Sequence, residues 1–306
     1  MRRLALSLAL ASAPVLQAQE FSQVKIMVVP VAAGIYMLQG AGGNIGLSVG
    51  DETFVIDDQY APLTQRIRDA ITTVTSKPVR FVVNTHWHGD HSGGNENMAI
   101  AGAIIVAHEN VRRRMSTEQF IEAFKSKVPA SPAAALPVIT FTDAISFYVN
   151  GDSIHVVHVD RAHTDGDALI GFRKANVVHM GDTYFNGMYP FIDVSSGGSI
   201  DGMIIAANRV LAMSNDSTRI IPGHGPLSTK ASLRKYRDLL VDVRGRIARL
   251  VAQRRSLAQI IAAKPLADYD STWGTGFIKP DQFVTIVHSS LTRKPTARAG
   301  TQHHER

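Results

Sequence analysis

The stretch NTHWHGDHSGGN, which begins at residue 84, restricts the fold and the chemistry of this chain more than any other feature. It follows the apolar run VRFVV and holds four potential metal ligands within six residues: His86, His88, Asp90 and His91. Alternate residues at the end of a strand point the same way, and Gly89 lets the chain turn so that the second pair faces the same point. Zinc accepts imidazole nitrogens and carboxylate oxygens as ligands. The stretch therefore predicts a metal site at a strand end rather than a polar surface turn.

Three more strand ends carry side chains of the same kind. The apolar runs IHVVHV, NVVHM and RII are each followed by a ligand type with glycine nearby, namely His163, Asp182 and His224. Together with the first four, these residues outnumber the ligands of one tetrahedral zinc ion. They suit two metal ions roughly 3.5–4 Å apart that share a carboxylate. The chain has no cysteine, so no thiolate takes part.

Strand patterns and helix patterns alternate along the chain, which indicates an α/β fold. Short apolar runs separated by turn residues predict strands within residues 34–58 and 145–182. Helical spacing predicts helices within residues 61–77, 199–213 and 230–256. This order predicts two sheets or one strongly twisted mixed sheet, with helices outside. The proline-rich stretch around residues 125–137 predicts a loop or the boundary of a lid.

Both ends of the chain are expected to lie outside the main domain. Residues 1–18 combine two arginines with an apolar run that is too short to span a bilayer, which is typical of a secretory signal peptide. We therefore expect export to the periplasm, a main domain at residues 19–292 and a disordered polar tail at residues 293–306. No later stretch predicts a transmembrane span. The net charge of +6 favours a solvated basic face over nucleic-acid contact.

The motif and the order of the later ligand types resemble the metallo-β-lactamase superfamily. H-W-H-G-D-H is followed by His163, Asp182 and His224 in that family's order. The resemblance implies a four-layer αβ/βα sandwich of two mixed sheets with outer helices and a metal site at one edge. It implies two zinc ions per chain. The first would be held by His86, His88 and His163, the second by Asp90, His91 and His224, and Asp182 would bridge the two.

One departure bears on the substrate. The superfamily's cysteine-using zinc β-lactamases have a cysteine where this chain has Asp182, and many carry a lysine shortly afterwards. Here that stretch holds Phe185, Asn186 and Gly187. The chain is similar instead to the aspartate-bridged branch, which includes glyoxalase II, quorum-sensing lactonases and other hydrolases. The phrase GDTYFNGMYPFIDVSSGGSIDGMI is most similar to periplasmic β-lactamase-like proteins.

The expected reaction is the opening of a β-lactam ring by a metal-bridging hydroxide. Asp90 would orient the hydroxide and pass on a proton, which makes it the predicted catalytic residue. Asp165 or Asp167 would hold a ligand histidine in place. Tyr184, Asn186 and Tyr189 would contact the substrate or its oxyanion.

Other readings of the same residues remain open at this point. A lactonase or thioester hydrolase would use the same metals, so the expected partner is a small molecule with a cyclic amide or ester. A nucleic-acid-processing enzyme is a remote alternative, because only about 40 residues separate Asp182 from His224, too few for a cap domain of typical size. A purely structural zinc site is a weaker alternative, because such a site needs only four ligands and this chain offers seven. Iron or manganese also accepts these ligand types. The oligomeric state is not indicated. Single histidines elsewhere are expected to be packed or on the surface: His108, His155, His158, His179 and His288.

Overall fold

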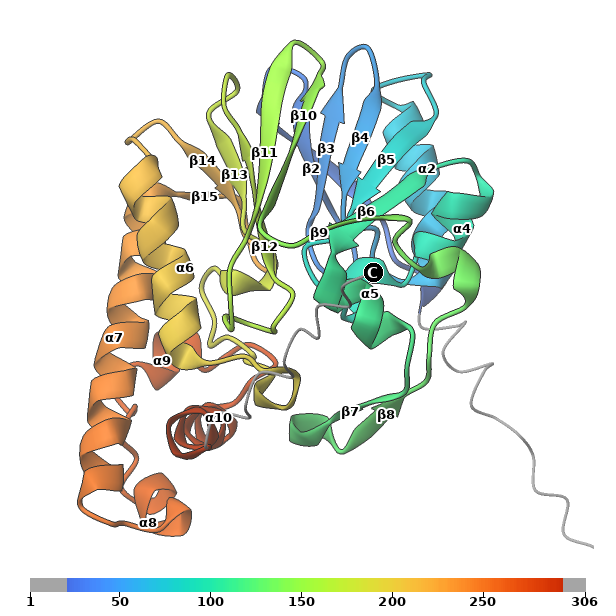
Figure 1. Ribbon diagram of the computed structural model, residues 1–306. Coiled ribbons are helices and arrows are strands. Elements are labelled where there is room, and N and C mark those ends of the chain that lie inside the picture. Colours follow the sequence, from blue (N-terminus) through green and yellow to red (C-terminus); the bar gives the residue numbers. More distant parts are fainter. Residues whose placement is uncertain (1–20, 294–306) are drawn as a thin grey trace, which may run out of the picture.

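Two β-sheets lie face to face between two layers of helices in the computed structural model, which describes residues 21–293 (Figure 1). Helices α6 and α7 cover the outer face of one sheet, and α2 and α4 cover the outer face of the other. This confirms the predicted four-layer αβ/βα sandwich. The predicted signal peptide and residues 294–306 of the predicted tail lie outside the described residues.

The first sheet has seven strands in the order β1-β2-β3-β4-β5-β6-β9. The pairs from β1 to β4 are antiparallel and those from β4 to β9 are parallel, so the sheet is mixed. Its strands are β1 (Met27–Ala32), β2 (Ile35–Gln39), β3 (Ile45–Val49), β4 (Thr53–Ile56), β5 (Val79–Val83), β6 (Ile104–His108) and β9 (Ile139–Phe141).

The second sheet has six strands in chain order, β10 to β15. Strands β10 to β13 form the predicted antiparallel meander, and β14 then joins β13 in parallel after the crossover through α6. Its strands are β10 (Ala144–Val149), β11 (Asp152–His158), β12 (Ala168–Phe172), β13 (Val177–His179), β14 (Arg219–Ile221) and β15 (Ser228–Thr229).

Polar side chains cap the first turns of several helices. The Ser199 hydroxyl accepts a hydrogen bond from the backbone N–H of Gly202 at the start of α6, and Thr229 serves α7 in the same way through Ser232. The α-helices are α2 (Thr64–Thr72), α3 (Gly89–Ser92), α4 (Asn95–Ile100), α5 (Glu109–Met115), α6 (Ile200–Met213), α7 (Lys230–Ala252), α8 (Leu257–Ala262), α9 (Asp270–Trp273) and α10 (Pro280–Thr292). Single 3₁₀ turns are η1 (Ala61–Leu63), η2 (Glu122–Phe124), η3 (Ala133–Ala135), η4 (Gly181–Thr183) and η5 (Val194–Ser196).

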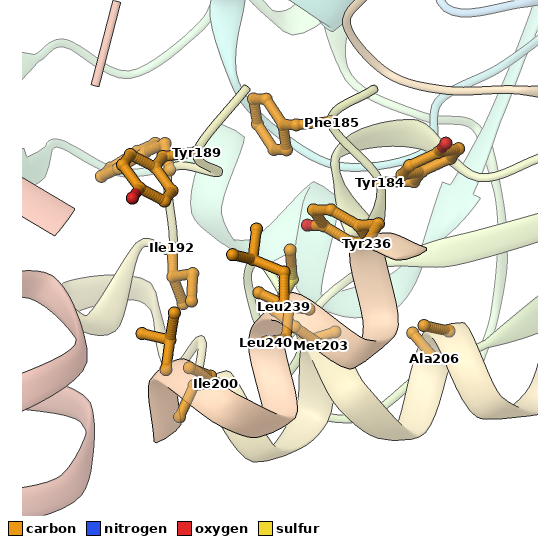
Figure 2. Packing of buried hydrophobic residues seen from close by; sticks show 14 of the residues in the cluster. Tyr184, Phe185, Tyr189, Ile192, Ile200, Met203, Ala206, Tyr236, Leu239 and Leu240 are labelled. Atoms are coloured by element: carbon orange, nitrogen blue, oxygen red, sulfur yellow. The ribbon is translucent and has the colours of Figure 1, made fainter. Parts of the chain in front are cut away.

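Three apolar layers hold the sandwich together. Inward side chains of both sheets, such as Phe54, Ile56 and Ile170, form the central layer. A second layer joins the second sheet to α6, α7 and α10 (Figure 2). A third joins the first sheet to α2 and α4. The central strands β4 and β12 are buried at every residue, which explains why all of their side chains except that of Thr53 are apolar or absent.

The proline-rich region differs from the prediction, because it begins with a small hairpin. Strands β7 (Gln119–Ile121) and β8 (Ser126–Val128) pair with each other and with neither main sheet. The hairpin projects from the edge of the sandwich below β6 and β9 (Figure 1). Among residues 21–293, no helix is both long enough and apolar enough to cross a membrane.

Candidate metal centre

The seven predicted ligand types converge at one edge of the two sheets. Four of them follow β5, and α3 begins directly after His88, so the chain turns within the motif. His163 lies between β11 and β12, Asp182 lies in η4 directly after β13, and His224 follows β14. Loops at the same edge of a sandwich bring residues together that are far apart in sequence. His91 and His224 are 133 positions apart, yet their Nε2 atoms are 3.4 Å apart.

The first trio consists of His86, His88 and His163. The Nδ1 atom of His88 lies 3.1 Å from Nε2 of His86 and 2.8 Å from Nε2 of His163. All three rings are buried. Three ring nitrogens that face one another at this distance, rather than hydroxyl or carbonyl partners, form a donor set for one cation.

The second trio consists of Asp90, His91 and His224. The Oδ2 atom of Asp90 lies 3.6 Å from Nε2 of His91 and 3.2 Å from Nε2 of His224. The side chains of Asp90 and His224 are 24% and 22% exposed, whereas His91 is fully buried. The centre therefore opens to solvent on the side of this trio.

Asp182 lies between the trios, and each of its oxygens faces one of them. Oδ2 is 3.5 Å from Nε2 of His163 and 3.9 Å from Nε2 of His86. Oδ1 is 3.0 Å from Nε2 of His91 and 3.4 Å from Nε2 of His224. Oδ1 is buried and accepts no hydrogen bond within the described part of the chain. A buried carboxylate oxygen without a hydrogen bond fits a position that bridges two cations.

Hydrogen bonds on the far side of each ring orient the first trio. His88 Nε2 lies 3.0 Å from Oδ2 of Asp193, and His163 Nδ1 lies 2.9 Å from the carbonyl oxygen of Phe191. His86 Nδ1 contacts the Thr85 hydroxyl at 3.0 Å. Each contact leaves the other ring nitrogen directed at the centre, which is how proteins fix histidine ligands.

Asp57 performs the same task for His91 and is absent from the sequence prediction. Its Oδ2 atom lies 2.7 Å from Nδ1 of His91 and accepts a 2.7 Å hydrogen bond from the Thr85 hydroxyl, while Oδ1 accepts from the Thr85 backbone N–H. Asp57 is fully buried directly after β4. Its position at a strand end in the sequence IDDQ is the signal that could have identified it.

The two predicted orienting aspartates differ from each other. Asp167 is buried and accepts hydrogen bonds from the backbone N–H groups of His163 and Thr164, so it holds the loop rather than an imidazole ring. Asp165 forms a paired contact with Arg114 at the edge of the site. Neither carboxylate contacts an imidazole of the centre among the described hydrogen bonds.

The pKa shifts of the histidines differ in direction between the two trios: they are downward at His86 and His163 and upward at His91 and His224. Burial, with the neighbouring histidines, holds the pKa of His86 well below its usual range and lowers the pKa of His163 to about 4. These rings are therefore neutral and able to bind a cation. Burial acts to raise the pKa of Asp90, but the charges of His91 and His224 prevail and lower it to about 2. Asp182 is likewise kept ionised, because the same two histidines outweigh its burial.

Close backbone approach explains two glycines beside the centre. A Cβ atom on Gly43 would lie 2.0 Å from Cε1 of His91, and one on Gly223 would lie 2.0 Å from Oδ1 of Asp182. The prediction that the chain needs a glycine at position 89 to turn is not matched by the structure. Gly89 is the first residue of α3, and a Cβ atom there would meet no described atom within 4 Å. The turn after His88 is therefore helical and does not depend on glycine.

The predicted substrate contacts lie mainly in the core. Tyr184 and Tyr189 are fully buried, and Figure 2 shows both among side chains of the layer beneath α6 and α7. The Tyr184 hydroxyl contacts Asn186 and Ser228, and the Tyr189 hydroxyl donates to Asp270. The Asn186 amide donates to the carbonyl of Pro226 in the loop after His224. These partners account for the three residues through packing and loop structure.

His179 also has a structural partner. It is buried, and its Nε2 lies 3.0 Å from the carbonyl oxygen of Asn44 in the first sheet. The ring of His108 stacks on that of His158, with centroids 3.8 Å apart, and its Nε2 lies 2.8 Å from the carbonyl oxygen of Thr142. His179, His108 and His158 therefore match the expectation of packed or surface histidines.

Comparison with known proteins places this geometry in a family. A family model described as the metallo-beta-lactamase superfamily matches residues 47–244, which includes all seven side chains of the centre. The fold is similar to a metallo-beta-lactamase from Pontibacter korlensis, with a TM-score of 0.57, 18% identity, and coverage of 71% of this chain and 100% of that one. The DIM-1 metallo-beta-lactamase gives a TM-score of 0.56 and 18% identity over 71% of this chain and 98% of its own.

A third similar structure is larger. The stereoselective inverting sec-alkylsulfatase Pisa1 from Pseudomonas sp. has a TM-score of 0.64 and 18% identity. The match covers 89% of this chain and 51% of the alkylsulfatase. At this level of identity, all three likenesses concern the fold.

Proposed function

Because this chain belongs to the metallo-beta-lactamase superfamily of zinc-dependent hydrolases, we propose that its centre holds two zinc ions and opens β-lactam rings. The observation that carries the proposal is the position of Asp182, whose two oxygens face different trios. His86, His88 and His163 would hold one ion, and Asp90, His91 and His224 the other. The fit rests on the converging ring nitrogens and on the buried Asp182 oxygen that lacks a hydrogen bond.

Two bound zinc ions supply a nucleophilic hydroxide at neutral pH and polarise a carbonyl group. The side chains determine where the proton goes. Contacts of Asp90 with His91 and His224 use Oδ2, so we assign Oδ1 as the atom that accepts a proton from the attacking water. The Asp90 side chain is 24% exposed, so a substrate can approach this carboxylate from solvent.

Two of the three fold relatives are named metallo-beta-lactamases, which motivates a lactam as the first substrate to test, whereas the third is an alkylsulfatase. The two metallo-beta-lactamases align over nearly their whole length, and both are about as long as the sandwich in this chain. Lactones and thioesters remain the alternative, because their carbonyl groups would meet the same side chains. Nucleic acid is the remote alternative. The signal-like segment at residues 1–18 supports export to the periplasm, where such a substrate would be met.

The test uses the purified full chain loaded with zinc. Hydrolysis of a chromogenic cephalosporin and of a simple lactone is followed with and without EDTA, in the wild type, in Asp182→Ala and in Asp216→Ala, which changes an exposed aspartate. The proposal predicts cephalosporin turnover that EDTA and Asp182→Ala abolish and Asp216→Ala preserves. Turnover of the lactone alone would reject the lactam assignment and favour the alternative.

A further inference from the structure

One stretch of the chain, residues 243–267, carries an unusual concentration of positive charge. It runs from within α7 through α8 and contains no aspartate or glutamate. The whole chain has 32 lysines and arginines against 26 acidic residues, so without the basic residues of this stretch the two signs would be equal in number. The stretch therefore accounts for the net charge of +6. Its six basic residues are Arg244, Arg246, Arg249, Arg254, Arg255 and Lys264.

Two of these six cations are paired and four are not. Arg244 forms an ion pair with Asp201 on α6, and Arg246 forms ion pairs with Asp242 and Asp268. The other four side chains are exposed and make no ion pair or hydrogen bond among the described residues, so their charge is directed to solvent. We call these four residues the basic corner: Arg249, Arg254, Arg255 and Lys264.

The fold brings the basic corner to one end of the molecule. Figure 1 shows α8 at the foot of α7, on the end of that helix that points away from both sheets. Arg246 donates a 2.9 Å hydrogen bond to the carbonyl oxygen of Pro265, so the chain returns to α7 after α8. Apolar side chains of this end, such as Leu250, Leu257 and Ile260, pack against the core. The corner therefore has its apolar side chains inside and its cations outside.

Acidic side chains nearby balance only one member of the basic corner. Lys264 lines a hollow of about 320 Å³ between the end of α8 and the start of α10, and the other charges of that hollow are Lys279, Asp270 and Asp281. The two carboxylates there offset the two lysines. None of the three arginines lines this hollow or forms an ion pair with a described carboxylate. The uncompensated charge of the basic corner therefore belongs to its arginines.

The composition of this end favours a lipid surface over a nucleic acid as the anionic partner. Residues 243–267 contain no phenylalanine, tyrosine or tryptophan, so no aromatic ring is available for stacking on bases. The exposed neighbours of the cations include the small side chains of Ala252, Ala258 and Ala262, which let a flat surface approach closely. Guanidinium groups pair with phosphate oxygens, and clusters of basic side chains are attracted to anionic lipid headgroups.

We propose that the basic corner docks this protein peripherally on the surface of a membrane that contains anionic phospholipid. The arginines would contact headgroup phosphates, while the sheets and the metal centre stay in water at the other end of α7. Each cation near such a surface raises the affinity by about fivefold, so three arginines raise it by about a hundredfold. The inference does not depend on the reaction at the metal centre.

Sedimentation with vesicles tests the proposal on the full chain. One set of vesicles is phosphatidylcholine alone, and the other is equal parts of phosphatidylcholine and phosphatidylglycerol. The double variant Arg254→Gln with Arg255→Gln should bind the mixed vesicles about 25-fold more weakly than the wild type, and Arg249→Gln alone about fivefold more weakly. High salt should remove the preference of the wild type for the mixed vesicles, because salt screens contacts between exposed charges.

The matched control is the double variant Arg234→Gln with Lys235→Gln. These two residues are also consecutive, exposed and without an ion pair in the described chain, and they lie on α7 about 30 Å from the arginine pair. All variants keep residues 1–20, so any contact of that segment with lipid is the same in each. Binding to phosphatidylcholine alone and the midpoint of thermal unfolding should be equal in all of them.

Three outcomes would overturn the membrane assignment. Equal losses in the control and in the arginine pair would show that only the net charge matters. Arginine variants that bind the mixed vesicles as tightly as the wild type would show that the basic corner makes no contact with lipid. If the arginine variants lost affinity for a DNA oligonucleotide but not for the mixed vesicles, the partner would be a nucleic acid.

Discussion

Asp57→Asn tests whether the carboxylate behind His91 controls the second metal position. Asparagine keeps the oxygen that accepts from the Thr85 backbone N–H, but it places an NH₂ group where Oδ2 now meets His91 Nδ1 at 2.7 Å. The new NH₂ group and the N–H at Nδ1 of His91 would then be two donors that face each other. The imidazole avoids this by moving its proton to Nε2, the atom directed at Asp90 and Asp182. A ring protonated there cannot bind zinc until it loses that proton.

The size of the effect follows from the lost contact. A hydrogen bond to a buried charged group contributes about 1.5–3 kcal/mol. Loss of an outer partner of a metal ligand lowers metal affinity by about 10–100-fold, and the two ranges agree. We expect this loss at the second trio. The first trio should lose less, because His86 reaches Asp57 only through the Thr85 hydroxyl. The metal-free variant should also lose about 1–3 kcal/mol of unfolding free energy, since buried donors lose their acceptor.

Competition with a chromophoric zinc chelator gives both dissociation constants in one titration. The control is Asp167→Asn, which changes a carboxylate that is also buried but bonds to the backbone of His163 and Thr164 rather than to a ring. It should leave the second constant unchanged. If Asp57→Asn raised both zinc dissociation constants equally, or raised neither of them, the reasoning would be refuted.

Three further predictions concern the centre and its surroundings. Gly43→Ala should displace His91 and lower the affinity for the second zinc ion, whereas Gly89→Ala in the motif itself should bind two zinc ions normally. Metal content after gel filtration measures both outcomes. Excess zinc should raise the midpoint of thermal unfolding, because zinc at a thousandfold excess over its dissociation constant stabilises the folded state by about 4 kcal/mol. EDTA should reverse the shift. A midpoint that responds to neither zinc nor EDTA would contradict the ligand assignment. Burial and the neighbouring His158 lower the pKa of His108 to about 4, so the unfolded chain binds more protons than the folded one between pH 6.5 and 4. Stability should therefore fall as the pH drops through that window, by up to about 3 kcal/mol, and urea unfolding of His108→Gln should show a smaller drop than the wild type.

Much of the fold and most of the centre can be predicted from the sequence because each signal is local. Strands β5, β11, β13 and β14 are short apolar runs, and a ligand type follows each of them within a few residues. Helices α6 and α7 show helical spacing over several turns and begin after Ser199 and Thr229, which cap them.

Contacts made through space are not visible in the same way. Asp193 lies 105 positions after His88, and nothing in its neighbours VSS indicates that it meets an imidazole ring. The support of His163 comes from a backbone carbonyl, a group that every residue has. Tyr184 and Tyr189 follow the bridging position in sequence, which favours substrate contact, but the chain turns them into the core beneath α7.

The hairpin was hidden for a different reason. Its strands have three residues each, which is too short for an alternating pattern, and the prolines that follow suggest irregular structure. Part of its support comes from a residue far away in sequence, because the Glu122 backbone N–H donates a hydrogen bond to the Ser195 hydroxyl.

The division of the centre between the two sheets has a consequence for how the chain folds. The first sheet supplies His86, His88, Asp90 and His91, and the second supplies the other three side chains, with His91 and His224 133 positions apart. Neither half offers a complete trio alone, so a zinc ion cannot act as the nucleus of folding. High affinity must arise late, after sheets built from separate stretches have docked. In a refolding experiment, zinc capture should therefore lag behind the formation of secondary structure and report the moment at which the two halves of the sandwich meet.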